Sequence, residues 1–495
     1  MADELFDPYA ALGIPQDASQ DLIEVAFEMM QKRFQSVERG KRTAVMNDQY
    51  RDAKRAHEIL TNPNLMLSAI KHTQFSQARQ QFAMKVTASR TQLPVIDEPQ
   101  VLYARLDFEP LDAALTTSER TSSNLNLTLV LDRSNSMQGT RLDRVKAAAF
   151  QIIENMTADD VISVVAFSDR ASVIVPATKV KDKPALKAQV TMMSAFGGTE
   201  IYHGLNEGLR QNREFLDPKF VNHILLLTDG NTYGDEEQCL GLATNASIEG
   251  IGISAMGLGT DWNDDFLDLL ATTTGGTSQF IRNVGEVGVF INNHVRHLSS
   301  TFAERLRIII NLAEGVVIDQ MFKIAPLPQP VEVTDGEIKL GILEARRPTT
   351  VLIQFRLVPG LDEGIFNVAR IVAVGDILVN RQPTYYLLHQ IMTEVTSMQF
   401  DDETNIEILD ALSRLALYRM QEQANEAIKR GEFEEATKRL EKLATRLLAM
   451  GQPALATHVL QEAHVVKTTH MLSAEGKKTI KYNTRVLINT QLREV

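Results

Sequence analysis

The stretch Leu125-Asn-Leu-Thr-Leu-Val-Leu-Asp-Arg-Ser-Asn-Ser-Met-Gln-Gly-Thr-Arg-Leu-Asp-Arg144 decides how this chain folds. Its mostly apolar first part, 125–131, predicts a strand that is buried on both faces. Directly after it, Asp132, Ser134 and Ser136 place three oxygen-bearing side chains at alternating positions of one loop. A helical pattern follows, so we expect this loop at the carboxyl end of a strand that feeds a helix. Ligands bind at such places in open α/β sheets.

The segment around this stretch, residues 122–300, alternates strand patterns with helix patterns. The further strands are expected at 161–167, 171–177, 223–228, 251–258 and 278–282. This order predicts a doubly wound, mainly parallel sheet with helices on both faces. Two more of its loops carry oxygen-bearing residues, since Thr199 follows a Gly-Gly pair and Asp229 stands in Thr-Asp-Gly.

Both flanks of this unit differ from it, so the fold class is a multidomain α/β chain. Short strand patterns at 99–121 and 301–381 predict a β-sandwich into which the α/β unit is inserted. Residues 382–470 have helical spacing and predict a helical bundle, while 471–495 look like a mildly basic tail. Residues 71–98 are polar, with Pro94 near the end and Pro99 directly after it, and we expect a short helix and then a linker there.

The first module, residues 5–70, contains two amphipathic helical patterns that predict an antiparallel hairpin. Asp7-Pro-Tyr-Ala-Ala-Leu-Gly-Ile14 and Ala56-His-Glu-Ile-Leu-Thr-Asn-Pro63 resemble the J domain of heat-shock co-chaperones. That family acts through a His-Pro-Asp loop, whereas residues 34–42 read Phe-Gln-Ser-Val-Glu-Arg-Gly-Lys-Arg. The resemblance therefore implies a degenerate J-like docking or structural module, with an unrelated helical hairpin as the alternative.

Length and composition exclude several classes of protein. A chain of 495 residues is too long for one core and predicts about three or four domains. The excess of 63 Asp plus Glu over 51 Lys plus Arg argues against general nucleic-acid binding. The single Cys239 excludes an intrachain disulfide, and no run reaches the roughly 18 apolar residues of a membrane span. We therefore expect a cytoplasmic protein without nucleic-acid or membrane partners.

The three oxygen-bearing loops predict a metal site. Its expected ligands are Asp132, Ser134, Ser136, Thr199 and Asp229. Carboxylates and hydroxyls without Cys or His suit a hard cation, Mg²⁺ best, with Mn²⁺ or Ca²⁺ also suitable. The alternative is a metal-free loop of helix caps.

Two further constellations compete with this reading. A Ser-His-Asp hydrolase using His203 is disfavoured, because the loop lacks a Gly-x-Ser-x-Gly elbow. Residues 261–265 contain several acidic groups, but a helix cap before Phe266 explains them more simply than a second cation site.

The Asp-x-Ser-x-Ser loop at 132–136, Thr199 and Asp229 together resemble the metal-ion-dependent adhesion site of von Willebrand factor A-type domains. The resemblance implies a non-catalytic interaction module, in which an incompletely coordinated cation takes a carboxylate from a protein partner. It also implies a switch by sliding of the last helix, at 287–298.

Two other functions stay open. Domains that look like this one accompany AAA-type ATPases, so the chain is alternatively a non-catalytic subunit of such a complex. The first module leaves a J-like co-chaperone as a further alternative.

Overall fold

The computed structural model describes residues 8–14, 18, 20–36, 44–61, 82–111, 123–232, 234–326, 328–331, 337–378, 382–398 and 405–489. Within these residues the strands form three sheets, two of five strands and one of six. The strands are β1 (Phe82–Ala88), β2 (Gln92–Pro94), β3 (Gln100–Pro110), β4 (Leu125–Asp132), β5 (Val161–Phe167), β6 (Ala171–Lys179), β7 (Val221–Gly230), β8 (Gly252–Asp261), β9 (Ser278–Ile281), β10 (Thr301–Leu312), β11 (Val316–Ala325), β12 (Gln329–Pro330), β13 (Glu337–Glu344), β14 (Thr349–Leu357), β15 (Gly364–Ile377) and β16 (Gln382–Thr396).

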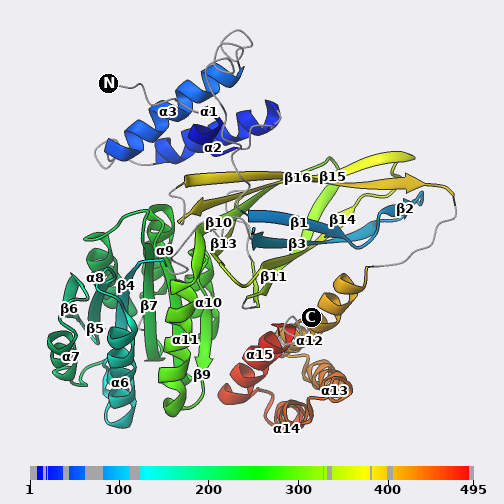
Figure 1. The fold of residues 1–495 in the computed structure, drawn as a ribbon. Coiled ribbons are helices and arrows are strands. Elements are labelled where there is room, and N and C mark those ends of the chain that lie inside the picture. The colour runs from blue at the N-terminus through cyan, green and yellow to red at the C-terminus, as the bar shows by residue number, and fades with distance from the viewer. Residues whose placement is uncertain are drawn as a thin grey trace, which may run out of the picture.

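Helices lie before, between and after these strands (Figure 1). They are α1 (Pro8–Leu12), α2 (Gln20–Ser36), α3 (Ala44–Thr61), α6 (Thr140–Asn155), α7 (Lys183–Thr191), α8 (Ile201–Arg213), α9 (Glu236–Glu249), α10 (Asp264–Thr273), α11 (Val287–Ser299), α12 (Ile406–Lys429), α13 (Phe433–Ala449), α14 (Pro453–Thr469) and α15 (Ala474–Asn489), with short 3₁₀ turns η2 (Asn135–Met137) and η3 (Val284–Glu286).

The central α/β unit has the strand order β6-β5-β4-β7-β8-β9, in which only β6 runs antiparallel to its neighbour. Every residue of β4 and β5 is buried, because helices cover both faces of the sheet. The chain leaves β4 toward β5 on one side, and from β7 it continues toward β8 on the other. The order therefore reverses between β4 and β7, which is where doubly wound sheets bind ligands. The predicted fold class is confirmed.

The other two sheets pack face to face around one apolar core, with the orders β1-β3-β14-β11-β12 and β13-β10-β15-β16-β2. Strand β3 precedes the α/β unit, and its partner β14 follows it. The α/β unit is thus inserted in a β-sandwich, as the sequence predicts. Both ends of the insert meet, since Ser123 N donates to Ser299 O at 3.0 Å and Ser123 Oγ to Thr301 O at 2.6 Å.

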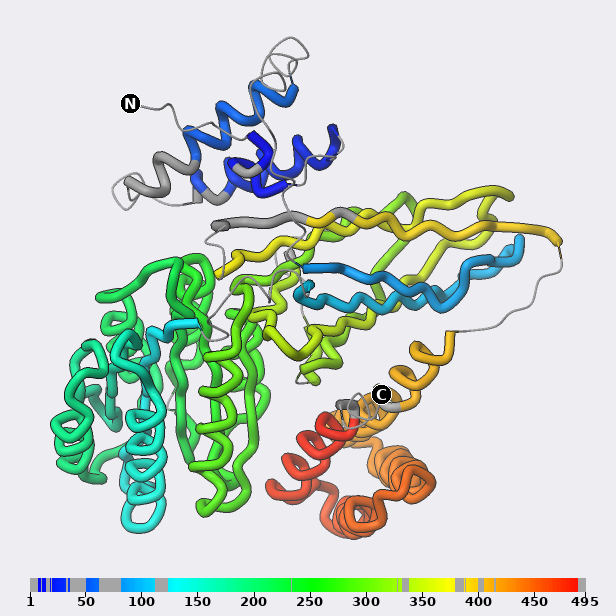
Figure 2. The backbone as a smooth tube through the Cα atoms, in the orientation of Figure 1, coloured from blue at the N-terminus to red at the C-terminus, as the bar shows by residue number. Residues whose placement is uncertain are grey.

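Helical modules cover the outer faces of the sandwich (Figures 1 and 2). The helices α1–α3 form a cluster that includes Val372 and Val374 of β15. On the other sheet, α12 packs Ile408 and Leu415 against Phe322. The loop in which a J domain would carry His-Pro-Asp falls mostly within 37–43, outside the described residues, so the J-like interpretation stays a prediction.

Three sequence expectations are wrong. Residues 82–94, expected as helix and linker, contain β1 and β2, and β1 pairs with β3 along its whole length. The bundle predicted from 382 begins only at α12, because 382–396 form β16, which buries Ile391, Thr393 and Val395 on one side. The tail predicted at 471–495 contains α15, where Lys478, Lys481 and Arg485 are buried. Their acidic partners lie more than 200 residues earlier, beyond the reach of local patterns.

Candidate metal centre

The first loop of the candidate site starts from a fully buried carboxylate at the end of β4. Asp132 Oδ1 accepts a hydrogen bond from Ser134 N at 2.8 Å, and Oδ2 accepts one from Thr228 Oγ1 at 2.6 Å. Burial raises the pKa of Asp132 to about 6, although these hydrogen bonds oppose the rise. A cation next to Asp132 would stabilise its ionised form, in place of the hydrating water that burial removes.

A chain of hydroxyl and carboxylate oxygens joins the first loop, 132–136, to the third loop, which carries Asp229 at the end of β7. Ser134 Oγ lies 2.9 Å from Ser136 Oγ, and Ser136 Oγ donates to Asp229 Oδ1 at 2.7 Å. The second oxygen of Asp229 is paired with the guanidinium of Arg141, from the first turn of α6. The Asp229 side chain is buried, and the guanidinium of Arg141 supplies a positive charge next to it.

The second loop is held against the first by two backbone hydrogen bonds. Asn135 N donates to Gly197 O at 3.0 Å, and Phe196 N donates to Arg133 O at 2.8 Å. Gly197 has φ +82°, and a Cβ there would lie 2.5 Å from Asp169 Oδ2, so the turn requires glycine. Thr199 faces the third loop, because a Cβ built on Gly230 would be 3.4 Å from Thr199 Oγ1.

All five residues predicted as ligands therefore lie on neighbouring loops at the carboxyl edge of the sheet. Their donors are two carboxylates and three hydroxyls, which fit a hard cation that keeps some of its water. Among the described residues, no group of three or more His, Cys, Asp or Glu is arranged so that it could hold a metal ion. The site is thus poor in the nitrogen and sulfur donors that zinc prefers.

The structure also describes the residues of the two other constellations, the hydrolase with His203 and the helix cap before Phe266. His203, the base of the imagined hydrolase, pairs with Glu200 at 3.0 Å, while the hydroxyls of Ser134 and Ser136 bond to each other. The expected cap is confirmed, since Asn263 Oδ1 accepts from Phe266 N at 3.1 Å.

Sequence reasoning missed two residues of the site, Thr228 and Arg141. Thr228 stands in the Thr-Asp-Gly motif, so its place next to Asp229 was the available signal. Nothing local marks Arg141 as a partner of Asp229, because 88 residues separate them.

Comparisons with known proteins agree with this architecture. Residues 126–292 match the family model of the von Willebrand factor type A domain. Residues 406–490 match one described as the Sll0103-like, C-terminal alpha-helical domain. The uncharacterized protein sll0103 of Synechocystis is 28% identical over 328 residues, which are 65% of this chain and 78% of that protein. The bovine inter-alpha-trypsin inhibitor heavy chain H4 is 29% identical over 168 residues, 32% of this chain but only 18% of that protein.

Two solved structures cover most of the chain. A von Willebrand factor type A protein from Catenulispora acidiphila has a TM-score of 0.66 at 17% identity, over 83% of this chain and 99% of its own. The ArnB paralog VWA2 from Sulfolobus acidocaldarius has a TM-score of 0.54 at 14% identity, over 82% and 98%. At these identities the likeness shows the fold.

Von Willebrand factor type A domains are in general protein-interaction modules, and they typically bind a divalent metal ion. Across the described part of the chain, none of the helices has the length and hydropathy of a membrane-spanning segment. The family match, the sheet order and the solved structures agree on one assignment: the chain is a multidomain protein built around a von Willebrand factor type A domain.

Proposed function

We propose that this chain binds a protein partner through a divalent cation, Mg²⁺ by preference, held by Asp132, Ser134, Ser136, Thr199 and Asp229. The cation would be bound incompletely, and a carboxylate of the partner would fill a free position. With only two protein carboxylates, the charge of a divalent ion is no more than balanced, so a third carboxylate is still attracted.

The observation that carries the proposal is the row of oxygens Ser134 Oγ, Ser136 Oγ and Asp229 Oδ1, which begins beside the buried carboxylate of Asp132. Buried carboxylates normally need a counter-charge, and the carboxylate of Asp229 is paired with the guanidinium of Arg141. The hydroxyls of Ser134 and Ser136 contact each other, and that of Ser136 also contacts Asp229. They lie where oxygen ligands of a hard cation are needed.

The metal part of the proposal is tested by titrating Mg²⁺ into the full chain in a calorimeter. Wild type should bind Mg²⁺, and Asp132→Ala should lose measurable binding while its circular dichroism stays unchanged. Asp143→Ala is the matched control, since it removes an exposed carboxylate from the first turn of α6. Equal Mg²⁺ affinity in Asp132→Ala and wild type would refute the site.

The partner part is tested with a fluorescent peptide that carries one aspartate between glycines and serines. We expect it to bind in Mg²⁺, to be released by EDTA, and to fail to bind Asp132→Ala. Binding that is indifferent to EDTA would refute recognition through the cation.

A further inference from the structure

A pocket of about 330 Å³ lies beside the candidate metal centre and is lined in part by a residue from a distant part of the chain. Asp229 and Arg141 line it on the metal side. Arg282, after β9, and Glu475, in the first turn of α15, line it as well. A partner segment that extends from the cation into this pocket therefore meets a residue of the C-terminal helical module.

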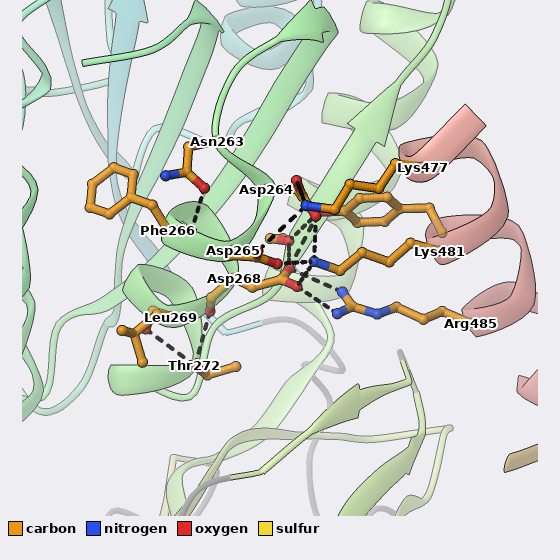
Figure 3. Close-up of polar contacts among 12 residues, drawn as sticks. Asn263, Asp264, Asp265, Phe266, Asp268, Leu269, Thr272, Lys477, Lys481 and Arg485 are labelled. Carbon is orange, nitrogen blue, oxygen red and sulfur yellow. Dashed lines mark hydrogen bonds and ion pairs between the residues drawn. The ribbon is translucent and has the colours of Figure 1, made fainter. Parts of the chain in front are cut away.

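The helix α15 is anchored to the von Willebrand domain by a set of ion pairs that we call the helix clasp. Its members are Lys477, Lys481 and Arg485 on α15 and Asp264, Asp265 and Asp268 on α10. The three cations are spaced by four residues, so they share one face of α15 and point at α10 (Figure 3). Arg485 donates to both oxygens of Asp268, at 3.0 and 2.5 Å, and Lys481 Nζ lies 2.6 Å from Asp264 Oδ2.

Asp264, Asp268, Lys481 and Arg485 form the buried part of the clasp, and their charges depend on one another. Burial alone would raise the pKa of Asp264, but the charge of Lys481 and the hydrogen bonds from both lysines lower it to about 2. Burial likewise opposes ionisation of Asp268, and the charges of Arg485 and Lys481 outweigh it, so that its pKa lies below its usual range. Both carboxylates therefore stay ionised and paired.

Apolar contacts and a helix cap fix the start of α15 as well. Tyr482 belongs to the core of the von Willebrand domain, and Lys478 Nζ lies 4.8 Å from the centre of the Trp262 ring. Gly476 N donates to Ser473 Oγ at 2.8 Å, and Ser473 is itself held by the buried Glu462. The first turn of α15, with Glu475, is thus held at the rim of the pocket.

In contrast with the clasp, the ion pair at the pocket is exchangeable. Arg282 Nη2 lies 2.5 Å from Glu475 Oε1, and the two side chains are 56% and 46% exposed. Exposed pairs of this kind are weak and screened by salt. A carboxylate brought by a partner can therefore replace Glu475 on Arg282 without moving α15.

We propose that the partner segment carries two carboxylates: one binds the cation, and the other takes the place of Glu475 on Arg282. In the protein without its partner, Glu475 of the same chain occupies the place on Arg282 that the partner's second carboxylate would take. We call this place the second acidic position. This inference rests on the proposed metal-dependent function and adds to it the kind of partner, an acidic segment with two nearby Asp or Glu residues.

The test compares two kinds of fluorescent peptide on the full chain by anisotropy. One carries a single aspartate, and a matched set carries a second aspartate two, three or four residues further on. In Mg²⁺ we expect at least one two-aspartate peptide to bind wild type about tenfold more tightly than the single-aspartate peptide. Arg282→Gln should abolish this advantage and leave the single-aspartate peptide unchanged, and Glu475→Gln should enlarge it. Arg296→Gln, an exposed arginine at another pocket, is the charge-matched control and should change nothing.

The outcomes separate the two proposals. Mg²⁺-dependent binding of all peptides with equal affinity, or an unchanged advantage in Arg282→Gln, would overturn the second acidic position and leave the proposed function standing. If no peptide binds in a Mg²⁺-dependent way, the proposed function itself is overturned, and this inference with it.

Discussion

The contribution of the helix clasp to stability can be tested by making the same Asp→Asn change at a buried position and at an exposed position of α10. Asp268 and Asp265 both lie on α10 and both pair with Lys481, but their side chains are 15% and 57% exposed. Asp268→Asn removes the charge that faces Arg485 and Lys481, whose side chains are only 6% and 4% exposed. Asp265→Asn removes the same charge where water can replace it.

The expected magnitudes differ several-fold. Removing one partner of a buried ion pair costs about 3–5 kcal/mol, because the other charge stays buried without compensation. Removing a charge from an exposed pair costs about 0.2–1 kcal/mol. With a urea dependence of about 1–3 kcal/mol per molar, Asp268→Asn should lower the midpoint of α15 release by about 1 M or more, and Asp265→Asn by a small fraction of that.

The assay uses the single tryptophan of the chain. Trp262 is 2% exposed and lies beneath Lys478 and beside Tyr482, both on α15. Release of α15 exposes its indole to water, so its emission moves to longer wavelength along the urea titration. Equal midpoints for the two variants would show that burial of the clasp does not decide its strength, and the reasoning would fail.

Two further predictions concern other parts of the domain. Burial, with a smaller contribution from the nearby His297, lowers the pKa of His294 from 6.5 to about 4, so the unfolded state takes up this proton first as the pH falls. The free energy of unfolding should then decline from pH 6.5 to 4, and His294→Leu should lessen that decline in urea titrations, unlike the exposed control His464→Leu. Gly257→Ala would place a Cβ 1.9 Å from the ring of Trp262 and should cost about 1–3 kcal/mol or more in thermal unfolding. Gly241→Ala, with open space around it in α9, should be neutral or stabilising by up to about 1 kcal/mol; equal losses for the two glycines would contradict the packing argument.

The central domain could be predicted from sequence because its signals are local. A parallel strand buried on both faces has a mostly apolar sequence, as in 125–131, and the residues directly after it lie at the edge of the sheet. Four of the five candidate ligands follow from the same rule, since Asp132, Ser134 and Ser136 stand at the end of β4 and Asp229 stands at the end of β7. Thr199 lies between α7 and α8, and the motif resemblance rather than a strand end indicated it. Their role as metal ligands remains a prediction.

The errors occur where the deciding contact is distant or the pattern is ambiguous. In β16 the apolar positions 387, 388, 391, 392 and 395 also fit helical spacing, yet the sheet buries 391, 393 and 395 and leaves Met392 exposed. Lysines and an arginine in α15 look like a solvated tail until their acidic partners on α10 are known. Such pairing is set by the tertiary structure, which no window of sequence contains.

The insertion of one domain into another dictates an order of events during synthesis. Thr350 of β14 donates to Asp107 of β3, a residue 243 positions earlier, across the whole inserted domain. At about 5–20 residues per second, a ribosome needs roughly 10–50 s to make that stretch. During this time β3 is paired with β1 on one side only, and its other edge, which later pairs with β14, is open. Open strand edges promote aggregation. The inserted domain, whose two ends are already joined at Ser123 and Ser299, can fold during this interval and hold the two halves of the sandwich together when the later strands emerge.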